Sequence, residues 1–316
     1  VVTIIAILAG LITAAAINAL NAAKRARISA QVKQLGQAME DFKNDTGAYP
    51  PNGVNNNLSN APPVSDFVRM FNKMFPRHQE PRGLIEGLAG NPNADYALNG
   101  GLSATEALYF WLGGFSEDPK YPISGVGGPS FSLSTGRGEI VEERNRRFDF
   151  DLAQLGPRDD NNQFNGRFLQ YEVNINGTPD ERRINLWQYY PEGSEQPLVY
   201  FDVSRHKPVD YDPPEAAGAA PGVFDQGQQV DVYALKKIRE GVAQPQDFAD
   251  IEFANTGKFQ ILHAGLDDTW GDWSTMSVQN PSPLDIGPLY PIGPFIGDIA
   301  DTLTNFTSGT LADEAE

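Results

Sequence analysis

Three aspartates in the last fifth of the chain could bind a metal ion. Asp267, Asp268 and Asp272 fall within six residues and closely follow the apolar segment 259–263. Calcium is a hard cation that takes about six to eight oxygen ligands, and carboxylates in one turn could supply several of them. The same residues are also typical of a plain turn after a strand, in which aspartates accept hydrogen bonds from backbone amides. The sequence leaves calcium and the turn as alternatives.

Two other oxygen-rich stretches could do related chemistry. Segment 159–166 holds two aspartates and three asparagines, but it lacks the terminal glutamate of an EF-hand loop. Asp202, Asp210 and Asp212 surround His206, a grouping that could form a carboxylate–histidine metal or acid–base site. The alternative is a solvated loop between a strand and a proline-rich segment, and we favour it.

Composition and missing motifs narrow the classes of function. The 316 residues contain no cysteine and only three histidines, which excludes cysteine-based zinc sites, redox pairs and cysteine nucleophiles. No G-x-S-x-G, P-loop, G-x-G-x-x-G or H-E-x-x-H pattern occurs. The 41 acidic residues outnumber the 24 basic ones, giving a net charge of −17. This charge argues against nucleic-acid binding and makes bound cations plausible. We expect no enzymatic activity.

The element that must organise such a chain is its first segment. Residues 1–23 carry no charge and no proline, and residues 24–44 continue with helical spacing. We therefore predict one largely continuous helix of about 65 Å, at 1.5 Å per residue. Thr46-Gly47 and the prolines at 50 and 51 should end it, because glycine suits a left-handed cap and proline cannot continue a helix.

The two halves of this helix need different surroundings. The second half has one apolar stripe at spacings of four, three, four and three, formed by Ile28, Val32, Leu35, Met39 and Phe42. Such spacing keeps side chains on one helix face, which we expect to pack on the rest of the chain. The first half is apolar on nearly every side, with Ile4, Ile5, Ile7, Leu8, Leu11, Ile12, Ile17 and Leu20. Its length of about 20 residues would also suffice to cross a bilayer.

The remainder predicts an α+β fold with antiparallel strands. Strand-like segments are 148–152, 167–175, 184–190, 198–203 and 259–263, and short helices are expected within 63–75 and at 103–112. Ser103 and Glu106 have the spacing of a capping box. We divide the chain into the helix, residues 1–50, and a loop-rich head, residues 51–316, in which the long helix lays its stripe on a small antiparallel sheet.

The N-terminal residues resemble those of the type IV pilin and type II secretion pseudopilin superfamily. The resemblance rests on VVTIIAILAGLI, on the charged continuation AKRARISAQVKQLGQAMEDFKNDTG and on AYPP, and it is closest to the large, major-pseudopilin-like members of planctomycete-type bacteria. It is weaker over 259–273 and 298–313. The family's glutamate at the fifth position has no counterpart, and about seven family residues would precede Val1. In the family, nearby loop carboxylates and carbonyls can hold calcium, and Asp267, Asp268 and Asp272 match the acidic positions of that motif.

The resemblance implies a homo-oligomeric helical filament. Its core would be a bundle of the first helix halves, whose burial drives heterologous assembly that does not close. Lys24, Arg25 and Arg27 would lie at the edge of this core and face acids of neighbouring subunits. The family's inner-membrane assembly machinery and prepilin peptidase would be partners. The location would be an extracellular filament or a periplasmic pseudopilus, with a precursor in the inner membrane.

Two alternatives stay open. One is a membrane-anchored extracytoplasmic enzyme or binding domain, which predicts single molecules in membranes and a pocket with convergent catalytic groups. The other shares the fold and differs in length: a secretion pseudopilus subunit that forms only a short periplasmic structure. The sequence does not separate a long filament from a short one, because length depends on partners and expression.

Overall fold

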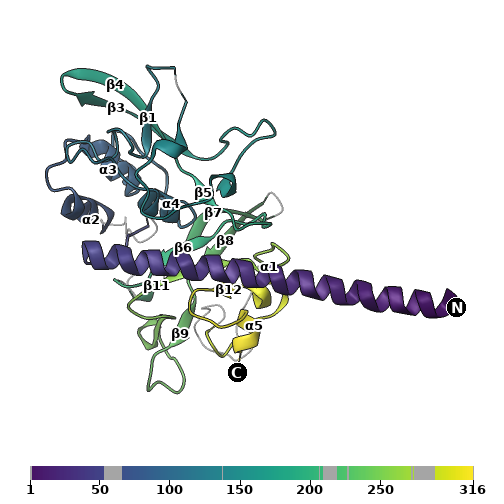
Figure 1. Ribbon diagram of the computed structural model, residues 1–316. Helices are drawn as coiled ribbons and strands as arrows, with labels where there is room; N and C mark the ends of the chain where they lie inside the picture. The colour runs from purple at the N-terminus through teal and green to yellow at the C-terminus, as the bar shows by residue number, and fades with distance from the viewer. Residues whose placement is uncertain are drawn as a thin grey trace.

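A computed structural model describes most of the chain. The described residues are 2–52, 66–136, 138–205, 207–208, 219–225, 228–271, 273 and 289–315. The predicted acid–base grouping at His206, Asp210 and Asp212 therefore lies outside them, as does Asp272. Figure 1 shows one long helix, α1, that crosses the head and projects beyond it at its N-terminal end.

Helix α1 spans Val2–Thr46, 45 residues without interruption. The absence of proline up to Gly47 allows this continuity, as the sequence predicts. The helix ends where Gly47 adopts a φ of 81° and its N–H donates to the Lys43 carbonyl at 2.7 Å. A left-handed residue of this kind turns the chain away from the helix axis, and the following residues lead back into the head.

Four further helices and several 3₁₀ turns accompany α1 in the part of the chain that the structure describes. The helices are α2 (Asp66–Met74), α3 (Arg82–Leu88), α4 (Ala107–Leu112) and α5 (Leu311–Glu314). The 3₁₀ turns include η2 (Val141–Glu143), η3 (Leu152–Gln154), η6 (Phe248–Asp250) and η7 (Gly297–Asp301).

The strands form small antiparallel sheets, which together with α1 make the fold α+β. The sheet beneath α1 has the order β12-β11-β6 (Leu303–Thr304, Phe259–His263, Val199–Asp202), and a second sheet has the order β1-β4-β3 (Ser130–Ser132, Thr178–Asn185, Phe168–Ile175). Two-stranded pairs are β2-β5 (Leu155–Gly156, Gln188–Tyr189), β7-β8 (Ala219–Asp225, Gln228–Tyr233) and β10-β9 (Ile251–Phe253, Lys236–Ile238).

The stripe on α1 joins the helix to the head. Its five side chains, Ile28 to Phe42, are at most 1% exposed. At Gly36 the helix passes close to the sheet, because a Cβ built there would lie 3.9 Å from the ring of Phe259 on β11. Near the end of α1, Phe42 meets Trp111 of α4 edge to face, with 6.0 Å between ring centroids. Strand β11 is buried on both faces: Ile261 packs with the α1 stripe and Leu262 with a second cluster around Trp270.

Two local predictions need correction. The helix expected at 103–112 begins at Ala107, because only half of the capping box forms. The Glu106 carboxylate accepts from the Ser103 N–H at 2.9 Å, but the Ser103 hydroxyl pairs with Thr105 instead. Segment 148–152 is not a strand: the Phe150 N–H donates to the Phe148 carbonyl at 3.1 Å, which turns the backbone too tightly for a strand, and Leu152 begins the 3₁₀ turn η3.

Candidate functional site

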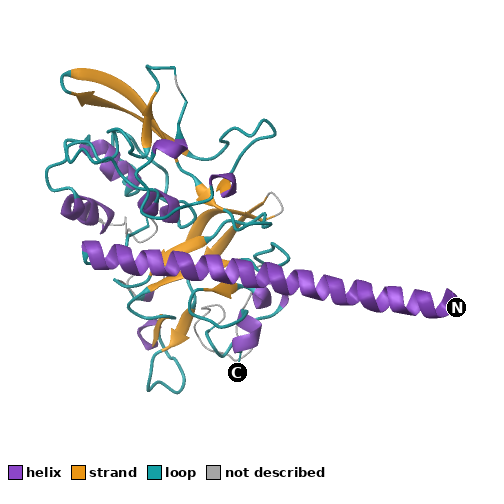
Figure 2. Ribbon diagram, viewed as in Figure 1, coloured by secondary structure: helices purple, strands orange, loops and turns teal. Residues whose placement is uncertain are grey.

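The first half of α1 is an apolar rod outside the head. The side chains described there are exposed, from 52% for Ile17 to 70% for Leu20; the others are Ile4, Ile7, Leu11 and Ile12. The side chains of Ile5 and Leu8 lie outside the described set. Figure 2 shows this half extending away from every strand and loop of the head. Soluble monomers rarely expose an apolar surface of this extent, which marks it as an interaction site.

Membrane crossing is a separate question. Among the residues that the structure describes, none of the helices meets both the length and the hydropathy that a membrane span requires.

Three cations lie where α1 leaves the head, and each contacts an acid of the same chain. The Lys24 ammonium lies 2.8 Å from Asp268 Oδ2 and donates to the Leu266 carbonyl at 2.9 Å. Arg25 lies 3.5 Å from Asp301 and 3.7 Å from Asp313, and Arg27 lies 2.9 Å from Glu192. Loops of the same head therefore supply acids to Lys24, Arg25 and Arg27. That these cations also face acids of neighbouring subunits stays a prediction.

The three pairs differ in how well they are shielded from water. Arg27 and Glu192 are both more than half exposed, so their pair adds little to stability. The Lys24 and Asp268 side chains are only 25% and 16% exposed. Their contact is therefore less screened, and it is the one that ties the helix most firmly to the head.

A partly buried chain of hydrogen bonds holds Asp268 in place. The Ser194 hydroxyl donates to Asp268 Oδ1 and lies 2.7 Å from His263 Nε2. On the far side of the ring, the Gly265 N–H donates to His263 Nδ1 at 3.0 Å. Since Nδ1 accepts, Nε2 carries the proton and donates to Ser194. The order of donation is thus His263 to Ser194 to Asp268, and Lys24 donates to the other carboxylate oxygen.

This order of donation differs from that of a serine nucleophile activated by a histidine base. His263 is completely buried, and desolvation lowers its pKa to about 4, so the ring is neutral at pH 7. A base must accept the serine proton, whereas Nε2 already holds a proton and the hydroxyl donates to Asp268. The arrangement fixes the position of a carboxylate instead of activating an oxygen.

Two of the three aspartates proposed for calcium, Asp267 and Asp268, form the alternative, a turn. The Asp267 carboxylate accepts from the Thr269 N–H at 3.1 Å, and Asp268 has a left-handed φ of 57°. Burial, with Asp301 and Asp298 nearby, raises the pKa of Asp267. Within the described part of the chain, no group of three or more acidic or histidine side chains is arranged to hold a metal.

The segment 159–166 and Asp202 also have local partners. Asp159 accepts from the backbone N–H groups of Asn161 and Gln163 at 2.9 and 2.8 Å, which closes a turn. The Asp202 carboxylate is buried; it accepts from Ser204, and Arg205 lies 3.4 Å away.

A close contact between two loops completes the support below α1. Asp301 accepts from the Leu266 N–H, and Gly265 has a φ of 107°. A Cβ at Gly265 would lie 2.6 Å from both the carbonyl and a carboxylate oxygen of Asp301. Only glycine fits both the conformation and the space, so the loop that carries Asp268 and the turn that carries Asp301 meet directly.

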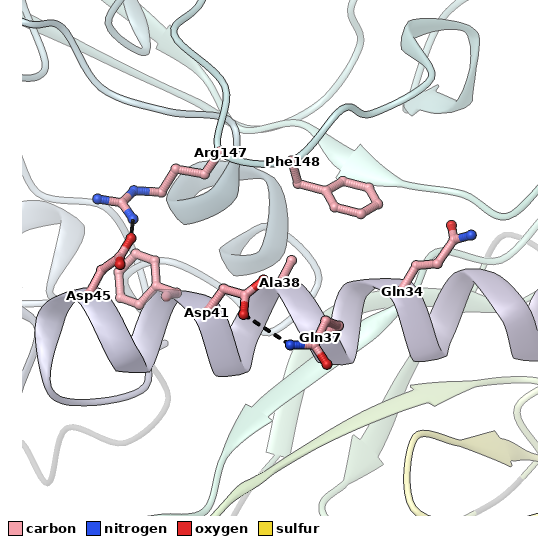
Figure 3. Close-up of a pocket in the computed structure, with 8 residues that line it drawn as sticks. Gln34, Gln37, Ala38, Asp41, Asp45, Arg147 and Phe148 are labelled. Atoms are coloured by element: carbon pink, nitrogen blue, oxygen red, sulfur yellow. Dashed lines mark hydrogen bonds and ion pairs between the residues drawn. The ribbon is translucent and has the colours of Figure 1, made fainter.

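A groove runs beside the second half of α1. It encloses about 420 Å³ between the helix and the segment at Arg147 and Phe148; the helix contributes Gln34, Gln37, Ala38, Asp41, Phe42 and Asp45. In Figure 3, Arg147 reaches Asp45, at 2.8 Å, while Gln37 donates to Asp41 at 2.9 Å.

Sequence reasoning identified the cations but not their partners. Glu192, Asp301 and Asp313 lie 165 to 288 positions from the arginines that they contact. Ser194 lies 74 positions from Asp268. A loop serine and scattered acids in an acidic chain give no local signal, so the folded structure is needed to bring them together.

Comparisons with known proteins add no relative to this picture: no family model, no curated protein and no solved structure matches the chain.

Proposed function

We propose that this chain is the structural subunit of a type IV pilin-like filament, assembled through the first half of α1. The observation that carries the proposal is the exposed apolar rod ahead of Lys24, which has no partner within the described head. Burying one exposed Ile or Leu side chain yields about 1.5–3 kcal/mol. Six such side chains on one rod supply enough free energy to offset the loss of motion on association.

The rod favours an open assembly over a closed pair. Its apolar side chains lie all around the helix axis, so a single partner covers only one side. Several copies around each rod cover it fully, and head-to-tail repetition of such contacts generates a helical fibre. The pilin-like character rests on this rod together with the second half of α1, which lies on a small antiparallel sheet.

The ionic contacts at Lys24, Arg25 and Arg27 fit this role. They tie the helix to the head at the point where the rod begins, so the head keeps a fixed direction relative to the rod. A fixed direction lets identical contacts repeat from copy to copy. An extracellular filament or a periplasmic pseudopilus uses the same contacts, and the length measured in micrographs decides between them.

The test is cryo-EM of material sheared from cells that express the chain. We expect regular filaments with a core of long helices. Single particles embedded in membrane would overturn the proposal and favour an anchored domain.

A matched pair of variants tests the contact itself. Replacing Leu11 and Ile12 by aspartate puts charges into the rod and should abolish filaments, whereas the exposed head residue Glu172 changed to lysine should leave them intact. Filaments that persist with both aspartates in place would contradict a core built from this rod.

A further inference from the structure

The second half of α1 has an exposed face that the head does not use. It lies opposite the buried stripe and continues the line of the rod, and it carries Ala23, Ala26, Ala30, Lys33, Gln34, Gln37 and Asp41. Small residues at its start allow another helix to approach closely. The two charged residues on this face, Lys33 and Asp41, indicate which helix that neighbour is.

Lys33 and Asp41 differ from every other charged residue of α1. The other six each contact a group outside the helix: Lys24, Arg25, Arg27, Glu40, Lys43 and Asp45. Within the described residues, Lys33 has no ion pair or hydrogen bond, and Asp41 accepts only from Gln37 on its own helix. One free cation and one carboxylate without a cationic partner thus remain on the exposed face of α1.

Helix geometry puts these two charges on different flanks. At 3.6 residues per turn, Lys33 lies about 40° to one side of the direction opposite the buried stripe, and Asp41 lies about 40° to the other side. The two are eight positions apart, which corresponds to about 12 Å along the axis at 1.5 Å per residue. Lys33 and Asp41 of one helix are therefore too far apart to pair with each other. Lys33 of one copy can instead face Asp41 of a second copy.

The flank with Asp41 is hollowed by the groove at Arg147 and Phe148. Its charged lining residues are Asp41, Asp45 and Arg147, and Arg147 already pairs with Asp45 at 2.8 Å. The groove therefore keeps one negative charge without a cationic partner. Figure 3 shows the Asp41 carboxylate turned along α1 toward Gln37, and Arg147 and Phe148 line the same groove. A single lysine side chain from a neighbour suits such a groove in charge.

We infer that the occupant is a second copy of this chain, whose Lys33 enters the groove and pairs with Asp41. Two parallel α1 helices then lie side by side with an offset of about 12 Å along their axes. One flank of each copy meets the other flank of the next, so the contact is heterologous and repeats without closing. The inference rests on the proposed function, since it specifies how neighbouring subunits are placed in the filament.

The first test exchanges the two charges in the full chain. K33D alone and D41K alone each put like charges together and should lower the yield of sheared filaments about tenfold, whereas the double variant K33D/D41K should restore it to about the wild-type level. Because both positions are exposed, circular dichroism should show an unchanged fold in all three. Wild-type filaments with no recovery in the double variant would overturn the pairing and leave the proposed function standing.

The second test exploits the absence of cysteine from the chain. A disulfide bridges only about 7 Å between Cα atoms, so the test uses a bis-maleimide about as long as a lysine side chain. Filaments of the variant K33C/D41C treated with this reagent should give a ladder of cross-linked multimers in denaturing gels. The matched control K33C/N174C, with its second cysteine exposed on β3, should stay monomeric. An equal ladder from both variants, or none from the first, would overturn the pairing. Wild-type cells without any filament would overturn the proposed function and this pairing with it.

Discussion

Ser194 carries no charge, yet its hydroxyl decides how Asp268 presents its carboxylate to Lys24. The serine accepts from His263 and from the Gln196 N–H, which leaves its own proton for Asp268 Oδ1. Oxygen Oδ2 then meets the Lys24 ammonium at 2.8 Å. Ser194 thus links the buried His263 ring to the ion pair at the base of the rod.

Exposure predicts different strengths for two of the ion pairs. Lys24→Met leaves Asp268 without its cation in a partly buried site and should lower the free energy of unfolding by about 1–3 kcal/mol. Arg27→Met breaks a pair whose members are both more than half exposed and should cost less than about 1 kcal/mol. Urea unfolding of the full chain in mild detergent measures both values. Equal losses in the free energy of unfolding would show that the two ion pairs do not differ in strength through burial.

His263 should make the head less stable in acid. Burial lowers its pKa from 6.5 to about 4, so between these pH values the unfolded chain binds a proton that the folded chain does not. Stability is therefore fully present above pH 6.5 and falls as pH drops toward 4, by about 3 kcal/mol in all. Lys24 and Asp268 are the charged groups that act on the ring.

The variant His263→Gln isolates this effect from the carboxyl groups, several of which have raised pKa values and the opposite sign. A glutamine amide can still donate to Ser194 but does not titrate. The stability gap between wild type and variant should narrow as pH falls from 7 to 4.5. Parallel curves over this range would show that the ring does not titrate on unfolding.

At the scale of elements, two glycines have opposite roles. Gly265 has a positive φ, and any Cβ there would meet Asp301, so Gly265→Ala should destabilise the chain by more than about 2 kcal/mol. Gly36 is helical, and its Cβ would have only ordinary contacts at 3.9 Å or more, so Gly36→Ala should stabilise by about 0.5–1 kcal/mol. Thermal unfolding of both variants gives the two signs, and a shared sign would contradict this account.

Substitutions on the two faces of α1 should also differ in their effect on stability. Leu35 is completely buried, and Leu35→Ala should cost about 2–5 kcal/mol through lost burial and the cavity it leaves. Gln34 is its neighbour on the exposed face, where alanine should change stability by less than about 0.5 kcal/mol. Denaturant midpoints of the two variants check the difference. A large loss at position 34 would mean that another group covers that face.

The stripe was predictable for a physical reason. Its spacing reflects the helical period, which depends only on local geometry, so Ile28 to Phe42 could be assigned to one face without knowing their partners. The capping box at Ser103 failed because a third residue, Thr105, competes for the hydroxyl. The acids around Lys24, Arg25 and Arg27 come from loops, and no local rule states where such loops meet.

The whole molecule separates into two parts by where its apolar side chains go. From Ile28 onward, the apolar face of α1 is covered by the head, whereas none of the side chains described between Thr3 and Ala23 is buried. Only the second half of α1 therefore contributes buried apolar side chains to the fold of the head. The first half remains available for contacts between molecules.

This separation predicts that the rod can be removed without unfolding the head. A chain beginning at Ala22 keeps Lys24, Arg25, Arg27 and the buried stripe, so its near-ultraviolet circular dichroism and unfolding midpoint should match those of the full chain. It should also be monomeric in sedimentation, because the apolar rod is gone. A chain beginning at Gly36 loses Ile28, Val32 and Leu35, which uncovers the sheet, and it should unfold or aggregate. If the chain from Ala22 still formed multimers, the head itself would be a principal source of assembly.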